Sequence, residues 1–336
     1  MSRMAVIGAG AWGTALAIAL GRKGTHSIRL WANEPEVVES IAKVRINERF
    51  LPGFELPASI EATNDLSAAL AGAEIVVSVM PSQHCRALFE RMAHSLRPDT
   101  LLVSCTKGLE NATLLRMTEV ITDVLRARKF TPRVGALSGP SFAKEVARGD
   151  PTAVTVASAD SEFVRAVQES FNSSRFRVYT NDDVIGVELG GALKNIIAIA
   201  AGVCDGLDLG HNSVAALITR GLAEMARLVV ACGGRLDTMA GLAGLGDLVL
   251  TCTGDLSRNR SVGVELGKGR NLSDIIAGMH GAVAEGVFTT KAAIGLASAK
   301  KVEMPITEQI FAILEKGKSP QQAIEDLMTR AARAES

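Results

Sequence analysis

The chain has 336 residues, of which 47% are hydrophobic and 21% are charged. This length is large for a single hydrophobic core and predicts two domains. Lysine plus arginine equals aspartate plus glutamate at 36 each, so the overall charge indicates neither a nucleic acid nor an anionic membrane surface as a partner.

The cysteines and histidines argue against disulfides and a metal centre. The five cysteines include no Cys-x-x-Cys pair, which is typical of reduced thiols in the cytoplasm, and the five histidines show no metal-ligand spacing. The first twenty residues contain an apolar run like that of a signal peptide, but Gly8, Gly10 and Gly13 interrupt it. No other run reaches the roughly 18 apolar residues that a membrane span requires. We therefore expect a cytoplasmic protein.

The N-terminal residues have the pattern of a dinucleotide-binding turn. A short apolar strand at 4–7 leads into Gly8-Ala9-Gly10-Ala11-Trp12-Gly13, and a helix over 14–22 and a second strand over 27–31 follow. Because the glycine motif follows a strand and opens a helix, it indicates dinucleotide binding more specifically than the glycines alone would. The alternative is a glycine-rich turn that binds no ligand.

Each glycine of the turn has its own physical role. Gly8 permits the turn, Gly10 lets the backbone approach a pyrophosphate, and Gly13 lets the helix pack on the strand. The N–H groups at the start of that helix then face the anion. The residue that contacts the adenosine ribose is expected about 20 residues later, where Asn33 and Glu34 stand. An aspartate there would favour NAD and an arginine NADP, so this pair leaves the choice open.

The next segment alternates between helices and continuously apolar strands, which is typical of a parallel sheet covered on both faces. The expected helices cover 35–46 and 66–71, a segment ending at 96, and 112–126. The expected strands cover 59–63, 74–79, 101–105, 134–137, 153–157 and 176–179, and 50–57 is expected to be a loop. The predicted fold class is α/β, with an N-terminal Rossmann-type doubly wound, mostly parallel sheet followed by a mainly α-helical C-terminal domain.

Ligands of such sheets bind beyond the carboxyl ends of the strands. This rule selects three turns as candidate site segments: Met80-Pro81-Ser82, Thr106-Lys107-Gly108 and Ser138-Gly139-Pro140-Ser141.

No strand is expected after about Ile185, which predicts a dinucleotide-binding domain at 1–185 and an all-α substrate-binding and catalytic domain at 186–336. Helical patterns cover 213–232, 260–268, 290–297, 307–315 and 320–331. The glycines at 241–246 follow no strand, so they indicate close helix packing that leaves Asp247 facing the site.

The segment 187–202 predicts a buried helix that carries Lys194 and Asn195 in its middle. A lysine in a helix usually lifts its ammonium into water. Here Gly190 and Gly191 precede it, and each costs about 1 kcal/mol against alanine in a helix, so something must approach that backbone closely. We interpret the approaching groups as substrate and nicotinamide.

Three cations, Lys107, Lys194 and Arg258, stand where they could converge on a small anionic substrate. The planar guanidinium of Arg258 suits a phosphate, with Ser257 and Asn259 as neutral donors. Oxidation of an alcohol by hydride loss also requires a base, and no histidine is well placed. Lys194 is the alternative if burial lowers its pKa from about 10.4 to about 7 or 8.

Six segments together resemble the bacterial type of NAD(P)-dependent glycerol-3-phosphate dehydrogenase, in order along residues 4–317. They are the glycine turn continued to Ala17, Cys105-Thr106-Lys107-Gly108-Leu109-Glu110, Ser138-Gly139-Pro140-Ser141-Phe142-Ala143-Lys144-Glu145, Leu189-Gly190-Gly191-Ala192-Leu193-Lys194-Asn195, Gly244-Leu245-Gly246-Asp247-Leu248 and Ser257-Arg258-Asn259-Arg260. Glu303-Met304-Pro305-Ile306-Thr307-Glu308 adds to the resemblance.

The resemblance implies reversible reduction of dihydroxyacetone phosphate to sn-glycerol 3-phosphate by NADH or NADPH, feeding phospholipid synthesis, in a homodimer. It implies that Lys194 is the proton acceptor, with Lys107 and Asp247 beside it. The implied cofactor-binding residues are Gly8, Gly10, Ala11, Trp12, Gly13, Asn33, Lys107, Ala143, Arg258, Val283 and Glu285. The implied substrate-binding residues are Lys107, Gly139, Ser141, Lys194, Asn195, Asp247, Thr251, Ser257, Arg258 and Asn259.

Two other functions remain as alternatives. Reductases of the 3-hydroxyacid or ketopantoate type share the two-domain plan and the helix lysine, but they tend to place an asparagine four residues after it, where this chain has Ala198. A non-catalytic dinucleotide sensor would keep the fold alone. The presence of Lys194, Asp247 and Arg258 argues against the sensor.

Overall fold

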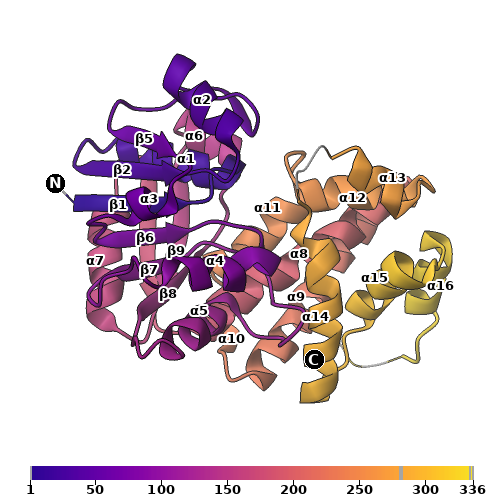
Figure 1. The fold of residues 1–336 in the computed structure, drawn as a ribbon. Coiled ribbons are helices and arrows are strands. Elements are labelled where there is room, and N and C mark those ends of the chain that lie inside the picture. The colour runs from indigo at the N-terminus through magenta and orange to yellow at the C-terminus, as the bar shows by residue number, and fades with distance from the viewer. Residues whose placement is uncertain (1, 280–282, 333, 335–336) are drawn as a thin grey trace.

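An α/β half and a helical half lie side by side in the computed structural model, which describes residues 2–279, 283–332 and 334 (Figure 1). The main sheet has the strand order β10-β9-β8-β7-β6-β1-β2-β5, and every neighbouring pair is parallel except β8 and β9. The predicted mostly parallel sheet is therefore confirmed. The strands are β1 (Ser2–Ile7), β2 (His26–Trp31), β5 (Ile60–Thr63), β6 (Ile75–Ser78), β7 (Leu101–Ser104), β8 (Arg133–Ser138), β9 (Thr152–Ala157) and β10 (Phe176–Asn181).

Helices cover both faces of this sheet, as the continuously apolar strands predict. Successive residues of β1 point to opposite faces, so Met4 and Val6 join one core while Ala5 and Ile7 join another. The first core is closed by α1 (Ala11–Gly21), α2 (Pro35–Val44), α6 (Ala143–Arg148) and α7 (Ser161–Phe171). The second is closed by α3 (Leu66–Leu70), α4 (Cys85–Met92) and α5 (Met117–Arg126).

Two local predictions in this half are wrong. Residues 50–57 do not form a loop, because β4 (Leu51–Glu55) pairs with β3 (Ile46–Asn47) in a separate antiparallel hairpin. Pro52 and Gly53 argued against a strand, but a two-stranded ribbon tolerates them because its outer edge needs no N–H donor. The helix expected from residue 112 begins only at Met117, where the Glu119 carboxylate accepts from the N–H of the N-cap residue Arg116 at 3.0 Å.

The helical half is organised around α8 (Val184–Gly206), the helix predicted over 187–202. It packs against α9, α11, α12 and α14, and its side chains from Gly186 to Cys204 are buried. The other helices are α9 (His211–Ala231), α10 (Leu236–Met239), α11 (Asp247–Thr253), α12 (Arg258–Gly267), α13 (Leu272–Ala277), α14 (Glu285–Lys300), α15 (Pro305–Lys316) and α16 (Pro320–Met328), with a π-helical turn, η2, at Leu242–Gly246.

Helix α8 also corrects the expectation that no further run would reach the length of a membrane span. Its length and mean hydropathy of 1.6 meet that criterion, because averaging tolerates Glu188 and Lys194 where a count of uninterrupted apolar residues does not. However, 89% of the apolar window is buried inside the protein. Packing against the surrounding helices accounts for its composition.

Helices α8 and α12 cross with their backbones in close contact. A Cβ atom added to Gly202 would lie 1.9 Å from the carbonyl oxygen of Arg260, and one added to Gly263 would lie 2.0 Å from that of Ile199. Neither neighbour is a flexible side chain. Contact between the two helices therefore depends on glycine at both positions.

We expect Gly202→Ala to lower the free energy of unfolding by up to about 2 kcal/mol. Alanine gains about 1 kcal/mol of helix propensity, but overpacking against backbone costs about 1–3 kcal/mol and separates two central helices. Thermal unfolding measures the loss. Gly278→Ala is the control, because Gly278 has helical dihedrals and its added Cβ meets nothing closer than 3.5 Å. Equal melting temperatures for the two variants would contradict the prediction.

Candidate functional site

The glycine turn between β1 and α1 has the geometry that its sequence predicts. Gly8 has φ +118°, and an added Cβ would lie 2.1 Å from the carbonyl oxygen of Val79 at the end of the neighbouring strand. An added Cβ on Gly13 would lie 1.9 Å from the carbonyl oxygen of Gly8, so the helix packs directly on the turn. Nothing lies within 4 Å of the same position on Gly10. The open side of Gly10 therefore fits a pyrophosphate.

The start of α1 has unused donors beside this opening. Helix α1 begins at Ala11, and no side chain caps its N-terminus. The Nε1 atom of Trp12 is buried without a hydrogen-bond partner among the described residues. Uncapped N–H groups and an unpaired indole donor both fit a dinucleotide lying across the turn. Asn33 follows β2 with its side chain exposed, so it is accessible to a ribose.

Asn47 supports this turn, although no sequence motif marks it. Its Nδ2 atom donates to the carbonyl oxygen of Ala9 and to Oγ1 of Thr14, both at 2.8 Å, and its Oδ1 accepts from the N–H of Phe50 at 3.1 Å. Asn47 is fully buried. The β3–β4 hairpin therefore holds the glycine turn in place, and no spacing rule could have indicated a contact between residues 38 positions apart.

A buried cluster of two lysines and one aspartate lies between the two halves. One carboxylate oxygen of Asp247, Oδ2, lies 2.5 Å from Nζ of Lys107, and the other, Oδ1, lies 2.8 Å from Nζ of Lys194. Lys107 follows β7, Lys194 lies on α8 and Asp247 begins α11. Lys194 is 6% exposed and Asp247 1%, so their charges interact with little screening by water, while the side chain of Lys107 is partly exposed.

Burial decides the protonation of this cluster. Loss of hydration lowers the pKa of Lys194, Asp247 opposes that shift and the nearby Lys107 ammonium adds to it, so that the resulting pKa is about 8. The two ammonium groups hold the pKa of Asp247 below its usual range despite its burial. Lys194 therefore has the depressed pKa that an acid and base near neutrality requires.

Neighbouring polar groups orient the lysine and tie the helices together. Nζ of Lys194 donates to Oγ1 of Thr251 at 2.6 Å, and that hydroxyl donates to the carbonyl oxygen of Asp247 at 2.6 Å. Asn259 donates from Nδ2 to Oδ1 of Asn195 at 2.9 Å and accepts at Oδ1 from the N–H of Gly286 at 2.9 Å. The structure thus brings Asn195, Thr251 and Asn259 into the same buried region as the lysine.

The remaining candidates lie on segments around the cluster. Gly139, with φ +143°, accepts at its carbonyl oxygen from Lys107 Nζ at 3.2 Å and from Ser141 Oγ at 2.9 Å. Ser257 caps α12 by accepting from the N–H of Arg260. Arg258, the first residue of that helix, is exposed and has no hydrogen bond or ion pair with residues 2–279, 283–332 or 334. An unpaired guanidinium there is available to an anion.

The cofactor candidates further along the chain divide into two groups. Ala143 begins α6 and Val283 precedes α14. Their side chains are apolar and form no hydrogen bonds. Glu285 begins α14 and accepts from the N–H and the hydroxyl of Ser82, at 3.0 and 2.6 Å. Burial raises the pKa of Glu285, and the two donors of Ser82 oppose that shift. This contact joins the 80–82 turn, which sequence reasoning selected, to the helical half.

The close approach expected at Gly190 and Gly191 is present, but its partners were predicted wrongly. An added Cβ on Gly190 would lie 2.6 Å from the carbonyl oxygen of Ala243, and one on Gly191 would lie 2.5 Å from Oγ of Ser138. These glycines therefore admit η2 and the end of β8 instead of substrate and nicotinamide. The same contact confirms that the glycines at 241–246 serve helix packing.

No group of three histidine, cysteine or carboxylate side chains within the described part of the chain is arranged to hold a metal ion.

Comparison with known proteins connects this geometry to a family. A family model described as NAD-dependent glycerol-3-phosphate dehydrogenase N-terminus matches residues 3–164, and its C-terminus counterpart matches residues 183–325. Proteins named glycerol-3-phosphate dehydrogenase (NAD(P)+) from Koribacter versatilis and Acidobacterium capsulatum are 67% and 58% identical to the chain. The first match covers 100% of this chain and 99% of the relative, and the second covers 100% of both.

A solved structure agrees with the sequence matches. The crystal structure of glycerol-3-phosphate dehydrogenase from Coxiella burnetii has a TM-score of 0.93 and 44% identity, covering 98% of this chain and 99% of the other. Both halves of the fold therefore have counterparts in one kind of oxidoreductase. The chain belongs to the NAD-dependent glycerol-3-phosphate dehydrogenase family.

Proposed function

We propose that the chain catalyses the reversible reduction of dihydroxyacetone phosphate to sn-glycerol 3-phosphate with NADH or NADPH. The observation that carries this proposal is the Lys107–Asp247–Lys194 cluster, which combines a depressed lysine pKa with a position between the dinucleotide turn and the helical half. Family membership supplies the substrate, since the named relatives are glycerol-3-phosphate dehydrogenases.

Each proposed role follows from a charge and its surroundings. Lys194 gives its proton to the carbonyl oxygen during reduction and accepts the hydroxyl proton during oxidation, because its pKa of about 8 permits both states. Lys107 stabilises the negative charge on that oxygen, and Asp247 orients both lysines. Arg258 binds the substrate phosphate with its unpaired guanidinium, assisted by Ser257 and Asn259.

The remaining candidates complete the binding sites. The substrate-binding set adds Gly139, Ser141, Asn195 and Thr251, which lie around the cluster. The bound nicotinamide dinucleotide donates or accepts the hydride, and its proposed binding residues are Gly8, Gly10, Ala11, Trp12, Gly13, Asn33, Lys107, Ala143, Arg258, Val283 and Glu285.

A comparison of substrates tests the function. Nicotinamide absorbance is followed with dihydroxyacetone phosphate, with 3-keto acids and with neither. Consumption with the phosphoketone alone supports the proposal. Consumption with keto acids alone would instead indicate a hydroxyacid or ketopantoate-type reductase, and dinucleotide binding without turnover would indicate a sensor.

We expect both NADH and NADPH to support turnover. Asn33 is exposed and neutral, and Glu34 is only partly exposed, so neither strongly excludes a 2′-phosphate or selects a free ribose hydroxyl. Steady-state kinetics with each cofactor measure the preference. A ratio of kcat/KM values beyond a thousandfold in either direction would contradict the prediction.

The setting of the enzyme is also proposed. We infer a dinucleotide-binding domain at 1–185, an all-α substrate-binding and catalytic domain at 186–336, and a homodimer formed through the helical half. Reduced, unpaired cysteines support a cytoplasmic location, and all five are free thiols. Production of glycerol 3-phosphate there would supply phospholipid synthesis.

A further inference from the structure

Residues 107–116 connect β7 to α5 and cross from the α/β half into the helical half. We call this segment the strap. Leu109 is fully buried in the hydrophobic core of the helical half, although it follows a strand of the other half. Leu114 has φ +62° and packs beside Gly295 of α14, where an added Cβ would lie 3.1 Å from its Cδ2 atom. The strap is therefore held by both halves.

The first end of the strap carries Lys107. Its ammonium lies 2.5 Å from Asp247 of α11 and donates to the carbonyl oxygen of Gly139 at 3.2 Å. Its Cγ atom would lie 3.6 Å from a Cβ added to Gly191 of α8. The position of the Lys107 ammonium therefore depends on the register between the strap and α8.

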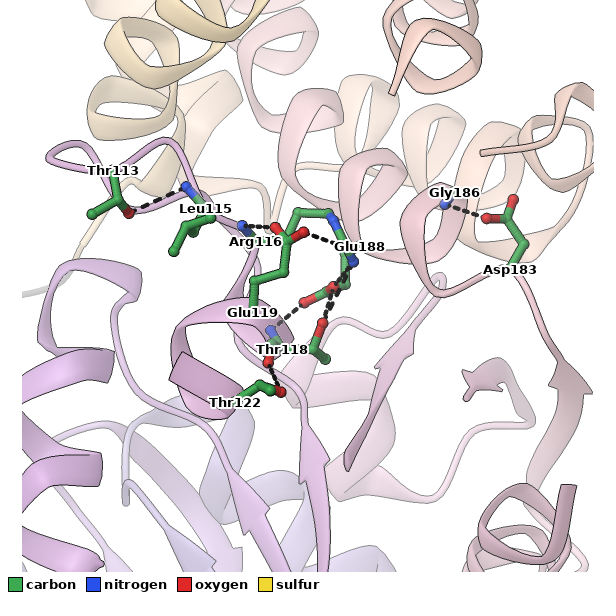
Figure 2. Close-up of polar contacts among 9 residues, drawn as sticks. All are labelled: Thr113, Leu115, Arg116, Thr118, Glu119, Thr122, Asp183, Gly186 and Glu188. Carbon is green, nitrogen blue, oxygen red and sulfur yellow. Dashed lines mark hydrogen bonds and ion pairs between the residues drawn. The ribbon is translucent and has the colours of Figure 1, made fainter. Parts of the chain in front are cut away.

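The other end of the strap meets α8 through a buried ion pair. Figure 2 shows Arg116 and Thr118 directed at the carboxylate of Glu188. Nη1 of Arg116 lies 2.6 Å from Oε2 of Glu188, while the N–H and the hydroxyl of Thr118 donate to the same carboxylate at 2.8 and 2.6 Å. The side chains of Arg116 and Glu188 are 14% and 5% exposed. Three donors therefore fix one carboxylate on α8.

The energetics of this pair favour a role in geometry over a role in stability. The hydration free energy that two charges lose on burial is comparable to the free energy of their mutual attraction, so replacement of both partners by neutral residues is often tolerated. Removal of one partner is costly because a charge is left buried without compensation. The pair therefore holds its partners at a fixed separation. Glu188 lies on the same helix as Lys194, six residues before it, which is about 9 Å along the axis.

We propose that Arg116 and Glu188 are positioning residues that set the register between the strap and α8, and thereby the placement of Lys107 and Lys194 around Asp247. The inference rests on the proposed roles of the two lysines. Neither Arg116 nor Glu188 is placed among the groups that contact substrate or cofactor. Arg116 and Glu188 act instead on the separation between the ammonium groups of Lys107 and Lys194, which are proposed to contact the substrate.

The test compares two paired substitutions. Arg116→Met with Glu188→Gln removes the charges of the pair, while the amide that replaces the Glu188 carboxylate can still bond to Thr118, so no buried charge is left alone. The matched control is Arg86→Met with Glu110→Gln. Arg86 and Glu110 lie 2.9 Å apart and attach the same strap to α4, within the α/β half. Each variant removes one ion pair of the strap, but only the first removes the pair that joins it to α8.

We expect the first variant to melt near the wild-type temperature but to lose about 10- to 100-fold in kcat for dihydroxyacetone phosphate, because small displacements of reacting groups have effects of that size. Its KM for the nicotinamide cofactor should stay within about threefold of the wild-type value, since the glycine turn is untouched. The kcat of the control variant should stay within about threefold of the wild-type kcat. A wild-type kcat in the first variant, or an equal loss in the control, would overturn the proposal.

Amide hydrogen exchange provides a readout that does not depend on turnover. Exchange over residues 107–111 should be faster in the Arg116→Met, Glu188→Gln variant than in the control, because the strap is released from α8. Equal exchange in the two variants would overturn the positioning role whatever the substrate proves to be. Failure of the proposed function would appear separately, as absence of wild-type turnover with dihydroxyacetone phosphate.

Discussion

Lys194→Met is expected to lower kcat for dihydroxyacetone phosphate by about 10²–10⁴-fold, the usual contribution of a positioned acid or base. Methionine fills a similar volume but carries no proton. The variant should fold, because an apolar side chain in this buried position avoids the loss of ammonium hydration, and Asp247 keeps Lys107 as a partner at 2.5 Å. Steady-state kinetics, thermal unfolding and a cofactor titration together measure the effect.

The control for this experiment is Lys300→Met, since Lys300 is exposed near the end of α14. It should leave kcat unchanged. If Lys194→Met binds cofactor and keeps kcat within about tenfold of the wild type, the proton transfer must be assigned to another group.

Asp247→Asn is expected to shift the pH dependence of glycerol 3-phosphate oxidation toward lower pH while reducing its rate. Oxidation requires neutral Lys194, so the wild-type kcat/KM should rise through a pKa of about 8. Burial and the Lys107 ammonium lower that pKa, and Asp247 is the main group that raises it, so removal of the carboxylate shifts the pKa of Lys194 downward. The midpoint must therefore move below about 8. A profile of kcat/KM against pH for both proteins measures the shift.

The same substitution should also destabilise the fold, because the buried ammonium of Lys194 and the partly buried ammonium of Lys107 lose their counter-charge. Removal of one partner from a buried ion pair costs about 3–5 kcal/mol, and deprotonation of Lys194 relieves part of that cost. Asp123→Asn is the matched control, since Asp123 pairs with Arg86 at 2.6 Å but is 58% exposed. A midpoint that stays in place or rises in Asp247→Asn would show that the carboxylate does not control the lysine.

The parts of the fold that the sequence predicts are those determined by neighbouring residues. The glycine turn is predictable because Gly8, Gly10 and Gly13 each meet a local steric requirement within one strand, turn and helix. The buried character of α8 follows from its composition, and a lysine inside it is unusual enough to indicate chemistry. Lys194 could therefore be proposed as the base before its surroundings were known.

The parts that could not be predicted depend on contacts between distant segments. Lys107 and Asp247 are separated by 140 positions, and no periodicity indicates that Lys107 and Lys194 share the carboxylate of Asp247. The same holds for Asn47 beneath the glycine turn and for Arg116 opposite Glu188. The reversed direction of β9 is equally unpredictable, because a continuously apolar strand has the same composition whichever way it runs.

The sharing of Asp247 between two lysines has a consequence for the energy of the finished reaction. With both lysines protonated, the three side chains carry one uncompensated positive charge in a region that water barely reaches. In the proposed reduction, Lys194 transfers its proton to the new hydroxyl group, and the side chains that remain are an electroneutral Lys107–Asp247 pair. The cluster itself thus ends each reductive turnover electroneutral, and Lys194 must take up a proton from solvent before the next.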